Sequence, residues 1–193
     1  MRNYEPNSKD RQELQKAVDE LLACKPFEIP VIIDGQEFRS GKLAKQVNPG
    51  DHAQAVCYYH EADERMVNIA IEGALKAKKQ WMNMPWSERA AISMKAADLI
   101  AHKYRYQLLA ATMVGQGKNV WQAEIDAGAE ICDFLRFGVK YVDDMYQIQP
   151  PRNSPGVWNR TEYRPLEGFV LAISPFNFTA IAGNLVICLL YTS

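Results

Sequence analysis

The chain of 193 residues carries 22 basic and 23 acidic residues, which gives a formal net charge of −1. That balance argues against nucleic acid as a partner and against a polybasic membrane patch, and no apolar run is long enough to cross a bilayer. Apolar residues at 48% and charged residues at 23% are ordinary for a globular protein, and the length allows one domain or parts of two.

The cysteine spacing indicates no metal site. Cys24, Cys57, Cys132 and Cys188 are far apart and form no C-x-x-C pair. Reduced thiols in an intracellular protein are therefore expected. Residues 1–7 mix charges and resemble neither a secretory signal nor a transit peptide, so any leader is expected to be absent from this chain.

The first 60 residues predict a helix and a small β region. Apolar residues recur at helical spacing over residues 10–22, after which two prolines end the pattern. Residues 31–38 predict a strand, a tight Asp-Gly turn and a return strand. A second turn at residues 48–51 leads into an alternating strand around residues 55–59.

The middle of the chain predicts helices. One helix ends near Trp81, and a second begins after Pro85 with Ser87 as its N-cap. The two glycines and the lysine of residues 115–118 then interrupt the helical pattern, and a long helix follows with apolar residues from Ile131 to Val142. Because residues 115–118 lack the Walker spacing and follow a helix rather than a strand, a helix–helix turn is expected there and not a phosphate loop.

Other side chains of this region are expected to have structural or solvated roles. Lys118 and Glu124 are predicted to be solvated surface charges. An aromatic residue at helical spacing usually belongs to the core. The packing anchors predicted on this basis are Trp81, Trp86 and Trp121.

The last part of the chain predicts a connector, a strand and a turn. Three prolines in residues 147–155 predict an exposed connector, and an extended arm follows over residues 157–165. Residues 169–173 predict a buried strand that runs into a Ser-Pro-Phe-Asn turn, and α/β enzymes hold cofactors and reacting groups at such a place. A helix is expected from Thr179 to Leu190.

Asn177 lies in this turn and allows two interpretations. Its amide N–H could donate to a developing oxyanion, which would stabilise a transition state by about 3–4 kcal/mol. Alternatively, its side chain could cap the helix that follows. Spacing alone favours the capping interpretation.

Residues 168–179, Gly-Phe-Val-Leu-Ala-Ile-Ser-Pro-Phe-Asn-Phe-Thr, resemble a segment of the aldehyde dehydrogenase superfamily. In that superfamily an Ile/Ser-Pro-Trp/Phe-Asn turn meets NAD and the oxyanion. Upstream matches agree with the resemblance and occur in order: Asn48-Pro49, Trp81, Glu88-Arg89 and the alanine-rich helix around residues 96–100.

Several motifs resemble one branch of the superfamily, which oxidises glutamate γ-semialdehyde to glutamate in proline catabolism. They are residues 112–118 (Thr-Met-Val-Gly-Gln-Gly-Lys), residues 122–127 (Gln-Ala-Glu-Ile-Asp-Ala) and residues 133–137 (Asp-Phe-Leu-Arg-Phe). Most other members carry an acidic residue where Gln116 stands. The resemblance covers nearly everything from the first helix to Leu185.

The resemblance implies an α/β enzyme with NAD as cofactor, a small aldehyde as substrate and catalysis by a covalent thiolate. It implies that Asn177 is the oxyanion donor, that Phe178 lines the aldehyde pocket and that Glu130 lies near the substrate's approach. The wall that faces the cofactor is implied to comprise Ile173, Ser174, Pro175 and Phe176. The nucleophilic cysteine and the general-base glutamate have no counterpart in this chain, which is expected to be inactive alone.

The resemblance also implies a division of the chain. Residues 1–60 would form an N-terminal helix and small β region, and residues 61–146 the helical part of the NAD-binding domain. Residues 147–167 would be a connector and oligomerisation-type arm. Residues 168–185 would be the first strand and helix of an incomplete Rossmann-like domain. Residues 186–193 are bulky where the superfamily has small residues, and are interpreted as a non-native tail.

The full-length protein is expected to be a homo-oligomer, in the mitochondrial matrix of a eukaryote or the cytoplasm of a bacterium. No metal, nucleic-acid partner or membrane contact is expected. Two alternatives stay open. The chain could be a non-catalytic short isoform that acts as a binding or oligomerisation module, or part of an NAD(P)-dependent dehydrogenase for another aldehyde.

Overall fold

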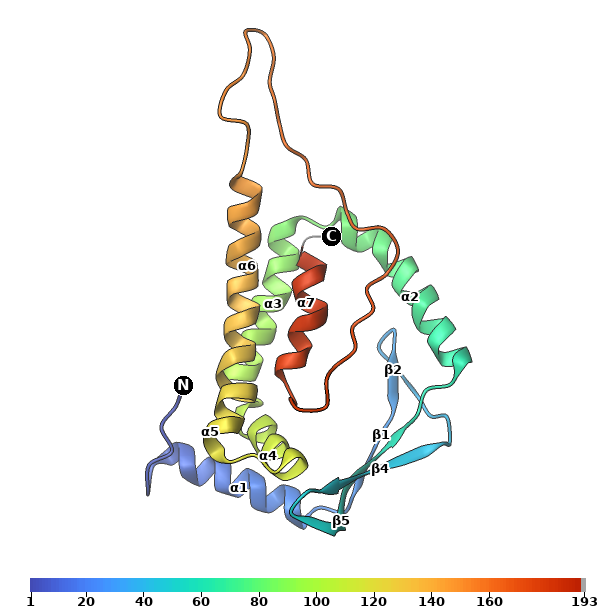
Figure 1. Ribbon diagram of the computed structural model, residues 1–193, viewed down its shortest axis with the longest axis vertical. Coiled ribbons are helices and arrows are strands. Elements are labelled where there is room, and N and C mark those ends of the chain that lie inside the picture. Colours follow the sequence, from blue (N-terminus) through green and yellow to red (C-terminus); the bar gives the residue numbers. More distant parts are fainter. Residues whose placement is uncertain (192–193) are drawn as a thin grey trace.

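The computed structural model describes the backbone of residues 1–191 and the side chains up to residue 187. Helices pack side by side in one half of the molecule, and strands lie at its lower edge (Figure 1). Among the described residues no helix is both long enough and apolar enough to cross a membrane, and no cluster of ligating side chains could hold a metal ion. The predicted tail, residues 186–193, lies largely outside the described side chains.

The first helix, α1, spans Lys9–Ala23 and confirms the predicted one. The Ser8 hydroxyl accepts a hydrogen bond from the Arg11 backbone N–H at 3.2 Å, which satisfies one of the unpaired N–H groups at the helix start. The buried side chain of Leu14 packs against Leu109 on the later helix α4. This contact holds the start of the chain against the middle of the sequence.

The β region consists of a three-stranded sheet and a separate hairpin. The sheet has the order β1–β5–β4, in which β1 (Phe27–Ile29) runs parallel and β4 (Leu43–Asn48) antiparallel to the central β5 (Asp51–His60). The hairpin pairs β2 (Val31–Ile33) with β3 (Gln36–Phe38). Its turn residues both have positive φ, 53° at Asp34 and 74° at Gly35, as the predicted Asp-Gly turn requires.

Two helices follow the sheet. Helix α2 (Glu64–Asn83) is capped by the Asp63 carboxylate, which accepts from the Met66 N–H at 2.8 Å. Helix α3 (Trp86–Ala101) has Pro85 in the N-cap position and no side-chain cap. The prediction that Ser87 is the N-cap is therefore wrong, because the helix begins two residues earlier than that cap would place it.

The predicted long helix is a continuous but irregular one. Helix α4 (Arg105–Gln116) ends at Gly117, whose φ of 65° closes the expected helix–helix turn. Helix α5 (Val120–Ala123) then runs into the π-helical segment η1 (Glu124–Glu130) and on into α6 (Ile131–Gln147). Such π-helical turns are rare and often accompany functional sites.

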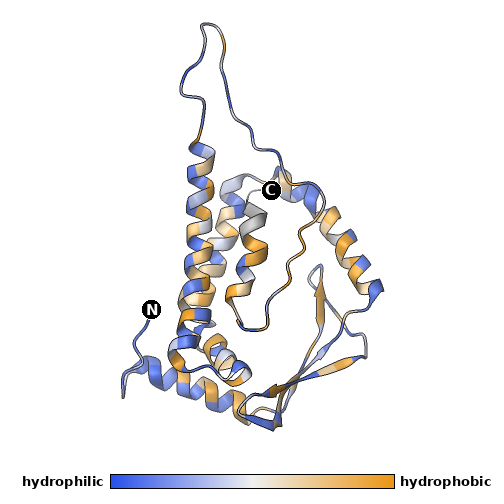
Figure 2. Cartoon of the chain, viewed as in Figure 1, coloured by the Kyte–Doolittle hydropathy of each residue, from blue (hydrophilic) through white to orange (hydrophobic). Residues whose placement is uncertain are grey.

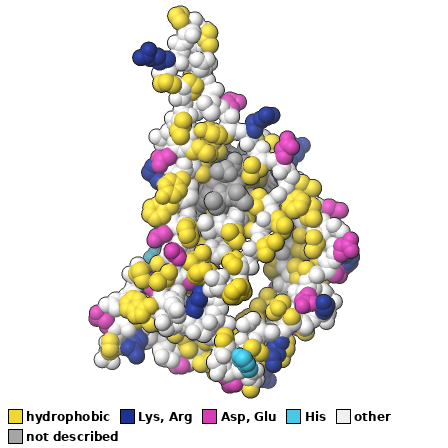
Figure 3. Space-filling model, in the orientation of Figure 1, with side chains coloured by type: hydrophobic (Ala, Val, Ile, Leu, Met, Phe, Trp, Pro, Cys, Tyr) yellow, Lys and Arg dark blue, Asp and Glu magenta, His cyan; other side chains and the backbone are white. Residues whose placement is uncertain are grey.

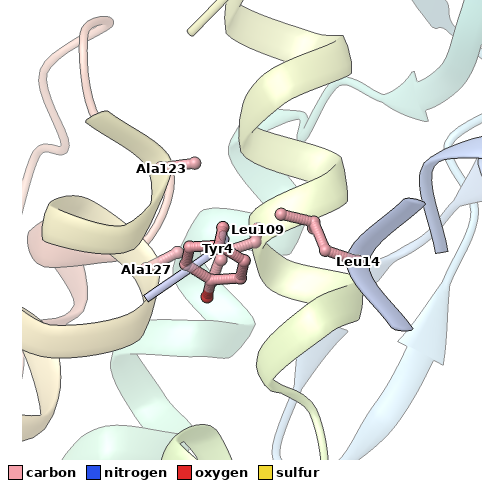
Figure 4. Close-up of a cluster of buried hydrophobic side chains, with 5 residues drawn as sticks. All are labelled: Tyr4, Leu14, Leu109, Ala123 and Ala127. Carbon is pink, nitrogen blue, oxygen red and sulfur yellow. The ribbon is translucent and has the colours of Figure 1, made fainter. Parts of the chain in front are cut away.

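Two buried clusters form the core. One joins α1, α4 and the α5–η1 segment, and its side chains converge as Figure 4 shows: Tyr4, Leu14, Leu109, Ala123 and Ala127. The other joins α3 to α6, where two alanines of α3 meet larger side chains of α6: Ala97, Ala101, Ile131, Cys132 and Leu135. The tryptophans contribute less than predicted, because Trp86 and Trp121 are 36% and 49% exposed. Trp121 packs its ring edge-on against Tyr4 instead.

From residue 148 to residue 180 the described chain contains neither helix nor strand. The predicted connector and arm are exposed and project beyond α6 (Figure 1). The predicted buried strand at residues 169–173 is not a strand but an irregular segment of largely hydrophobic residues (Figure 2). Leu171 and Ile173 are 73% and 77% exposed. No other described strand pairs with this segment, so its backbone lacks the ladder that defines a strand.

The final helix begins later than predicted. A short 3₁₀ turn, η2 (Ile181–Gly183), precedes α7 (Asn184–Tyr191), so the expected start at Thr179 is wrong by five residues. Helix α7 lies against α3 and α6 (Figure 1). The residues before it are held in place by side chains from η1.

A buried ionic cluster ties the N-terminus to the helices. Arg105 of α4 pairs with Glu124 of η1, and both are almost completely buried. The Tyr4 hydroxyl donates to Glu124 at 2.6 Å, and the Arg2 backbone N–H donates to the same carboxylate at 2.7 Å. Arg105 also donates to the Gly128 carbonyl at 2.9 Å. A buried charge of this kind is tolerated because an opposite charge and further hydrogen bonds accompany it, although the Nε of Arg105 is buried without a hydrogen-bond partner.

Replacing Gly128 with alanine is expected to lower the free energy of unfolding by about 1–3 kcal/mol. A Cβ at this position would lie 2.7 Å from Glu124 Oε2 and 2.9 Å from Arg105 Nη2. Neither buried group can move away without weakening the ion pair. Urea denaturation followed by circular dichroism measures the change.

Gly115→Ala is the matched control, because nothing lies within 4 Å of a Cβ placed there. A helical Gly-to-Ala change of this kind is expected to stabilise the protein by about 0.5–1 kcal/mol. Equal stabilities of the two variants would contradict the close packing around the ion pair.

Candidate active site

The Asn177 turn is defined as residues 174–181, and one carboxylate binds the backbone at its C-terminal end. Asp126 of η1 accepts hydrogen bonds from the backbone N–H groups of Thr179 at 2.8 Å, Ala180 at 3.0 Å and Ile181 at 3.0 Å. The Asp126 side chain is fully buried. It therefore satisfies three N–H groups that would otherwise lack a partner ahead of α7.

Lys118 makes three contacts at the same place. Its Nζ lies 3.1 Å from Asp126 Oδ2 and donates to the backbone carbonyl of Asn177 at 2.6 Å. It also lies 4.3 Å from the centroid of the Phe178 ring, a cation–π distance. Just before it, the Gln116 side chain donates to the Phe176 carbonyl at 3.3 Å.

Two charges that the sequence predicts to be solvated are therefore structural. The Lys118 side chain is only 17% exposed and Glu124 is fully buried. The prediction is wrong because each side chain has an oppositely charged partner that its immediate sequence neighbours do not reveal. Lys118 pairs with Asp126, and Glu124 pairs with Arg105. A buried charge becomes tolerable when such a partner is present.

Asn177 itself does not cap the following helix. Asp126 bonds the N–H groups of residues 179–181, and among the described residues no hydrogen bond engages the Asn177 side-chain amide. The Asn177 side chain is exposed. The capping interpretation is wrong, and the role of this amide as an oxyanion donor stays a prediction.

The other predicted site residues lie on both sides of this turn. Ile173, Ser174, Pro175 and Phe176 form an exposed, extended run, in which Phe176 is 96% exposed. Phe178 lies against Lys118. Glu130 is exposed at the end of η1, and among the described residues no hydrogen bond or ion pair joins it to the turn. The structure thus brings Asn177 and Phe178 together with Lys118, and leaves Glu130 apart.

Sequence reasoning missed Asp126 as a residue of this site. Its position in the pattern gives a signal, because it lies beside Ala127 and three residues after Ala123, both of which are fully buried. A carboxylate on the apolar face of a helix is expected to be paired when it is buried. Its backbone N–H partners lie more than 50 residues away and cannot be inferred from local spacing.

Burial and hydrogen bonding act in opposite directions on Asp126. Burial alone would raise the pKa of this carboxyl. The three backbone N–H groups of Ile181, Thr179 and Ala180, together with the Lys118 ammonium, outweigh burial and hold the pKa below its ordinary value. The charged form is therefore the one that the fold stabilises.

An apolar cleft lies beside the site segment. It has a volume of about 430 Å³ and separates α2 from residues 165–170. Trp81, Met82 and Phe169 are among the residues that line it. Hydrophobic side chains gather on this face of the molecule (Figure 3).

Comparison with known proteins places the chain in a family. Residues 36–190 match the aldehyde dehydrogenase family. The delta-1-pyrroline-5-carboxylate dehydrogenase of Agaricus bisporus is 60% identical over 96% of this chain and 34% of its own length. The mitochondrial delta-1-pyrroline-5-carboxylate dehydrogenase of Emericella nidulans is 54% identical over 95% of this chain and 32% of its own length.

A solved structure agrees with these relatives. The crystal structure of the delta-pyrroline-5-carboxylate dehydrogenase from Mycobacterium tuberculosis, bound with NAD, matches with a TM-score of 0.92 at 42% identity. The match covers 96% of this chain and 35% of that chain. The chain therefore belongs to the aldehyde dehydrogenase family, and the predicted α/β, aldehyde dehydrogenase-like fold is confirmed. It spans about a third of the length of these relatives.

The contribution of Asp126 to stability is expected to depend on pH. Because its pKa is lower in the folded protein, the contribution is complete above the unfolded value, about pH 4, and is lost as pH falls through the folded value. At pH 7, Asp126→Asn is expected to lower the free energy of unfolding by about 1.5–3 kcal/mol. Melting curves between pH 7 and pH 3 measure both proteins, and a difference that stays constant over this range would contradict the role of the charge.

Proposed function

We propose that the chain is part of an NAD-dependent dehydrogenase that oxidises L-glutamate γ-semialdehyde, formed from delta-1-pyrroline-5-carboxylate, to L-glutamate. The observation that carries this proposal is the 54–60% identity, along nearly the whole chain, to two proteins that bear the name of this activity. The site supports it as well. Two side chains of the motifs that resemble this branch hold the Asn177 turn. Gln116 donates to the Phe176 carbonyl, and Asp126, within residues 122–127, accepts from the Thr179 N–H.

The residues proposed to face NAD fit a flat ring system. Ile173, Pro175 and Phe176 present apolar surface, and their exposure leaves that surface open to a ligand. Pro175 fixes its own φ and restricts the residue before it, which limits the motion of the segment. NAD would accept the hydride there. The chain's own residues would orient the cofactor and exclude water from one of its faces.

Asn177 is proposed to stabilise the oxyanion through its side-chain N–H. A donor of this kind must be fixed before the reaction and must not be consumed by an internal hydrogen bond. The exposed amide of Asn177, on a backbone held at its own carbonyl and at the Phe176 carbonyl, meets both conditions. Phe178 and Glu130 are proposed to contact the aldehyde, on the resemblance alone.

The described cysteines do not suit the role of the nucleophile. Burial raises the pKa of the Cys57 and Cys132 thiols, which disfavours the reactive thiolate. Cys24 is exposed just past the end of α1, at the C-cap position and away from the Asn177 turn in the sequence. The nucleophile is therefore proposed to come from a part of the full-length enzyme that this chain does not contain.

In the full-length enzyme, Asn177→Ala is expected to lower kcat about 10²–10³-fold, because one oxyanion donor is lost. NADH formation from glutamate γ-semialdehyde measures the rate. Asn68→Ala is the matched control, since this asparagine is exposed on α2. A kcat of Asn177→Ala equal to that of the wild type would contradict the proposed role.

The same assay decides between substrates. The wild-type kcat/KM for glutamate γ-semialdehyde is expected to exceed that for an uncharged aldehyde such as propionaldehyde. The reverse order would favour a dehydrogenase for another aldehyde. For a eukaryotic host we also propose a mitochondrial location, which rests on the naming of the Emericella nidulans relative.

The projecting arm is proposed to join subunits. Side chains connect the outgoing and returning parts of the arm. The side-chain oxygen Oε1 of Gln149 accepts from the Thr161 N–H at 2.9 Å, and the Tyr163 hydroxyl donates to the Met145 carbonyl at 2.9 Å. No described strand pairs with the arm, so the backbone groups that these internal hydrogen bonds do not engage are available to a second copy. Trp158, which is 78% exposed, would supply apolar contact area.

Trp158→Asp is therefore expected to shift the full-length protein toward smaller assemblies. Analytical ultracentrifugation measures the mass, and Ile32→Asp, at another exposed apolar position on β2, is the control. An unchanged mass would leave the arm without a role in assembly. Co-purification of the short chain with full-length subunits would instead favour the interpretation of the chain as a non-catalytic binding module.

A further inference from the structure

Five backbone groups of the Asn177 turn are bonded by side chains from one short stretch of chain. The carbonyl of Phe176 accepts from Gln116 and that of Asn177 accepts from Lys118. The N–H groups of residues 179–181 all donate to Asp126. The stretch from Gln116 to Asp126 thus determines the path of the backbone on both sides of Asn177.

The side chain of Asn177 is treated differently from its backbone. Its carbonyl is held at 2.6 Å, whereas its amide has no partner among the described residues. The result is a fixed backbone that presents an unengaged donor. A catalytic donor needs this combination, because its position must be held to within about half an ångström while its hydrogen bond stays available.

Stability alone does not account for the Asp126–Lys118 pair. Both side chains are largely buried, at 1% and 17% exposure, and burying an ion pair offsets much of its own attraction through desolvation. A neutral hydrogen-bond acceptor would satisfy the N–H groups of residues 179–181 without the desolvation cost of a buried charge. The charged pair adds something else, because Lys118 connects the carboxylate directly to the carbonyl of Asn177.

We propose that Asp126 and Lys118 are positioning residues for Asn177. Asp126 fixes the backbone after Asn177, and Lys118, which is oriented by Asp126, fixes the carbonyl of Asn177 itself. Together they set the direction in which the amide points. The proposal rests on the function proposed above, since the orientation matters only if this amide stabilises an oxyanion.

The test uses the full-length enzyme with Asp126→Asn and Lys118→Met. Each change is expected to lower kcat about ten- to hundredfold, because a displacement of the donor of about 1 Å has an effect of that size. KM for the aldehyde and for NAD is expected to stay within about threefold, since neither residue is proposed to touch them. Asp126→Glu, which keeps the charge, is expected to recover part of kcat.

Asp133→Asn is the matched control, because it makes the same chemical change at an exposed position on α6. Its kcat is expected to equal that of the wild type. A merely structural role for Asp126 would lower the melting temperature while kcat per folded enzyme stayed unchanged. That outcome would overturn the proposal.

Amide hydrogen exchange supplies a readout that does not depend on the substrate. In Asp126→Asn the N–H groups of residues 179–181 are expected to exchange at least about tenfold faster, while those of α3 stay unchanged. Unchanged exchange would overturn the positioning role for any substrate. A wild-type enzyme that is inert to a panel of aldehydes would instead remove the proposed function, so the two failures are distinguishable.

Discussion

Two buried carboxylates that lie two residues apart on η1, Glu124 and Asp126, organise this molecule. A buried charge must be paired, and each of these carboxylates finds its partners in a distant part of the chain. Glu124 binds Arg105 and the N-terminal residues Arg2 and Tyr4, whereas Asp126 binds Lys118 and the backbone ahead of α7. One irregular turn therefore fixes both ends of the described chain. The two side chains leave η1 in different directions because residues two positions apart do not share a helix face.

The same constraint explains the contrast between the Asn177 turn and the segment before it. Residues 176–181 have partners for five backbone groups, so the turn has a defined path without belonging to a helix or sheet. Residues 169–173 have an apolar sequence but no neighbouring strand, and they stay extended and exposed. Apolar character alone does not produce a strand, because the backbone N–H and C=O groups also need a ladder.

Membership in the aldehyde dehydrogenase family gives these features a chemical context. The turn that we propose to meet the cofactor and the oxyanion is held by Gln116, Lys118 and Asp126, which lie within motifs that resemble one branch of the family. Exposed aromatic and aliphatic side chains lie next to the turn, and an apolar cleft lies beside the segment that leads into it. We propose that these residues form one face of a dehydrogenase site and that the nucleophile lies elsewhere.

The sequence by itself determined the helices at residues 9–23 and 64–83, the Asp-Gly hairpin, the exposed arm and the family, because periodicity and turn chemistry are encoded locally. It predicted a functional turn around Asn177, although the spacing alone favoured a capping role for this side chain. Only the tertiary structure decided that Asp126 binds the N–H groups ahead of α7, that Glu124 is buried and Lys118 half-buried, and that residues 169–173 form no strand. These are properties of contacts between distant residues: Asp126 and Thr179 are 53 positions apart, and nothing in either local sequence specifies that they meet.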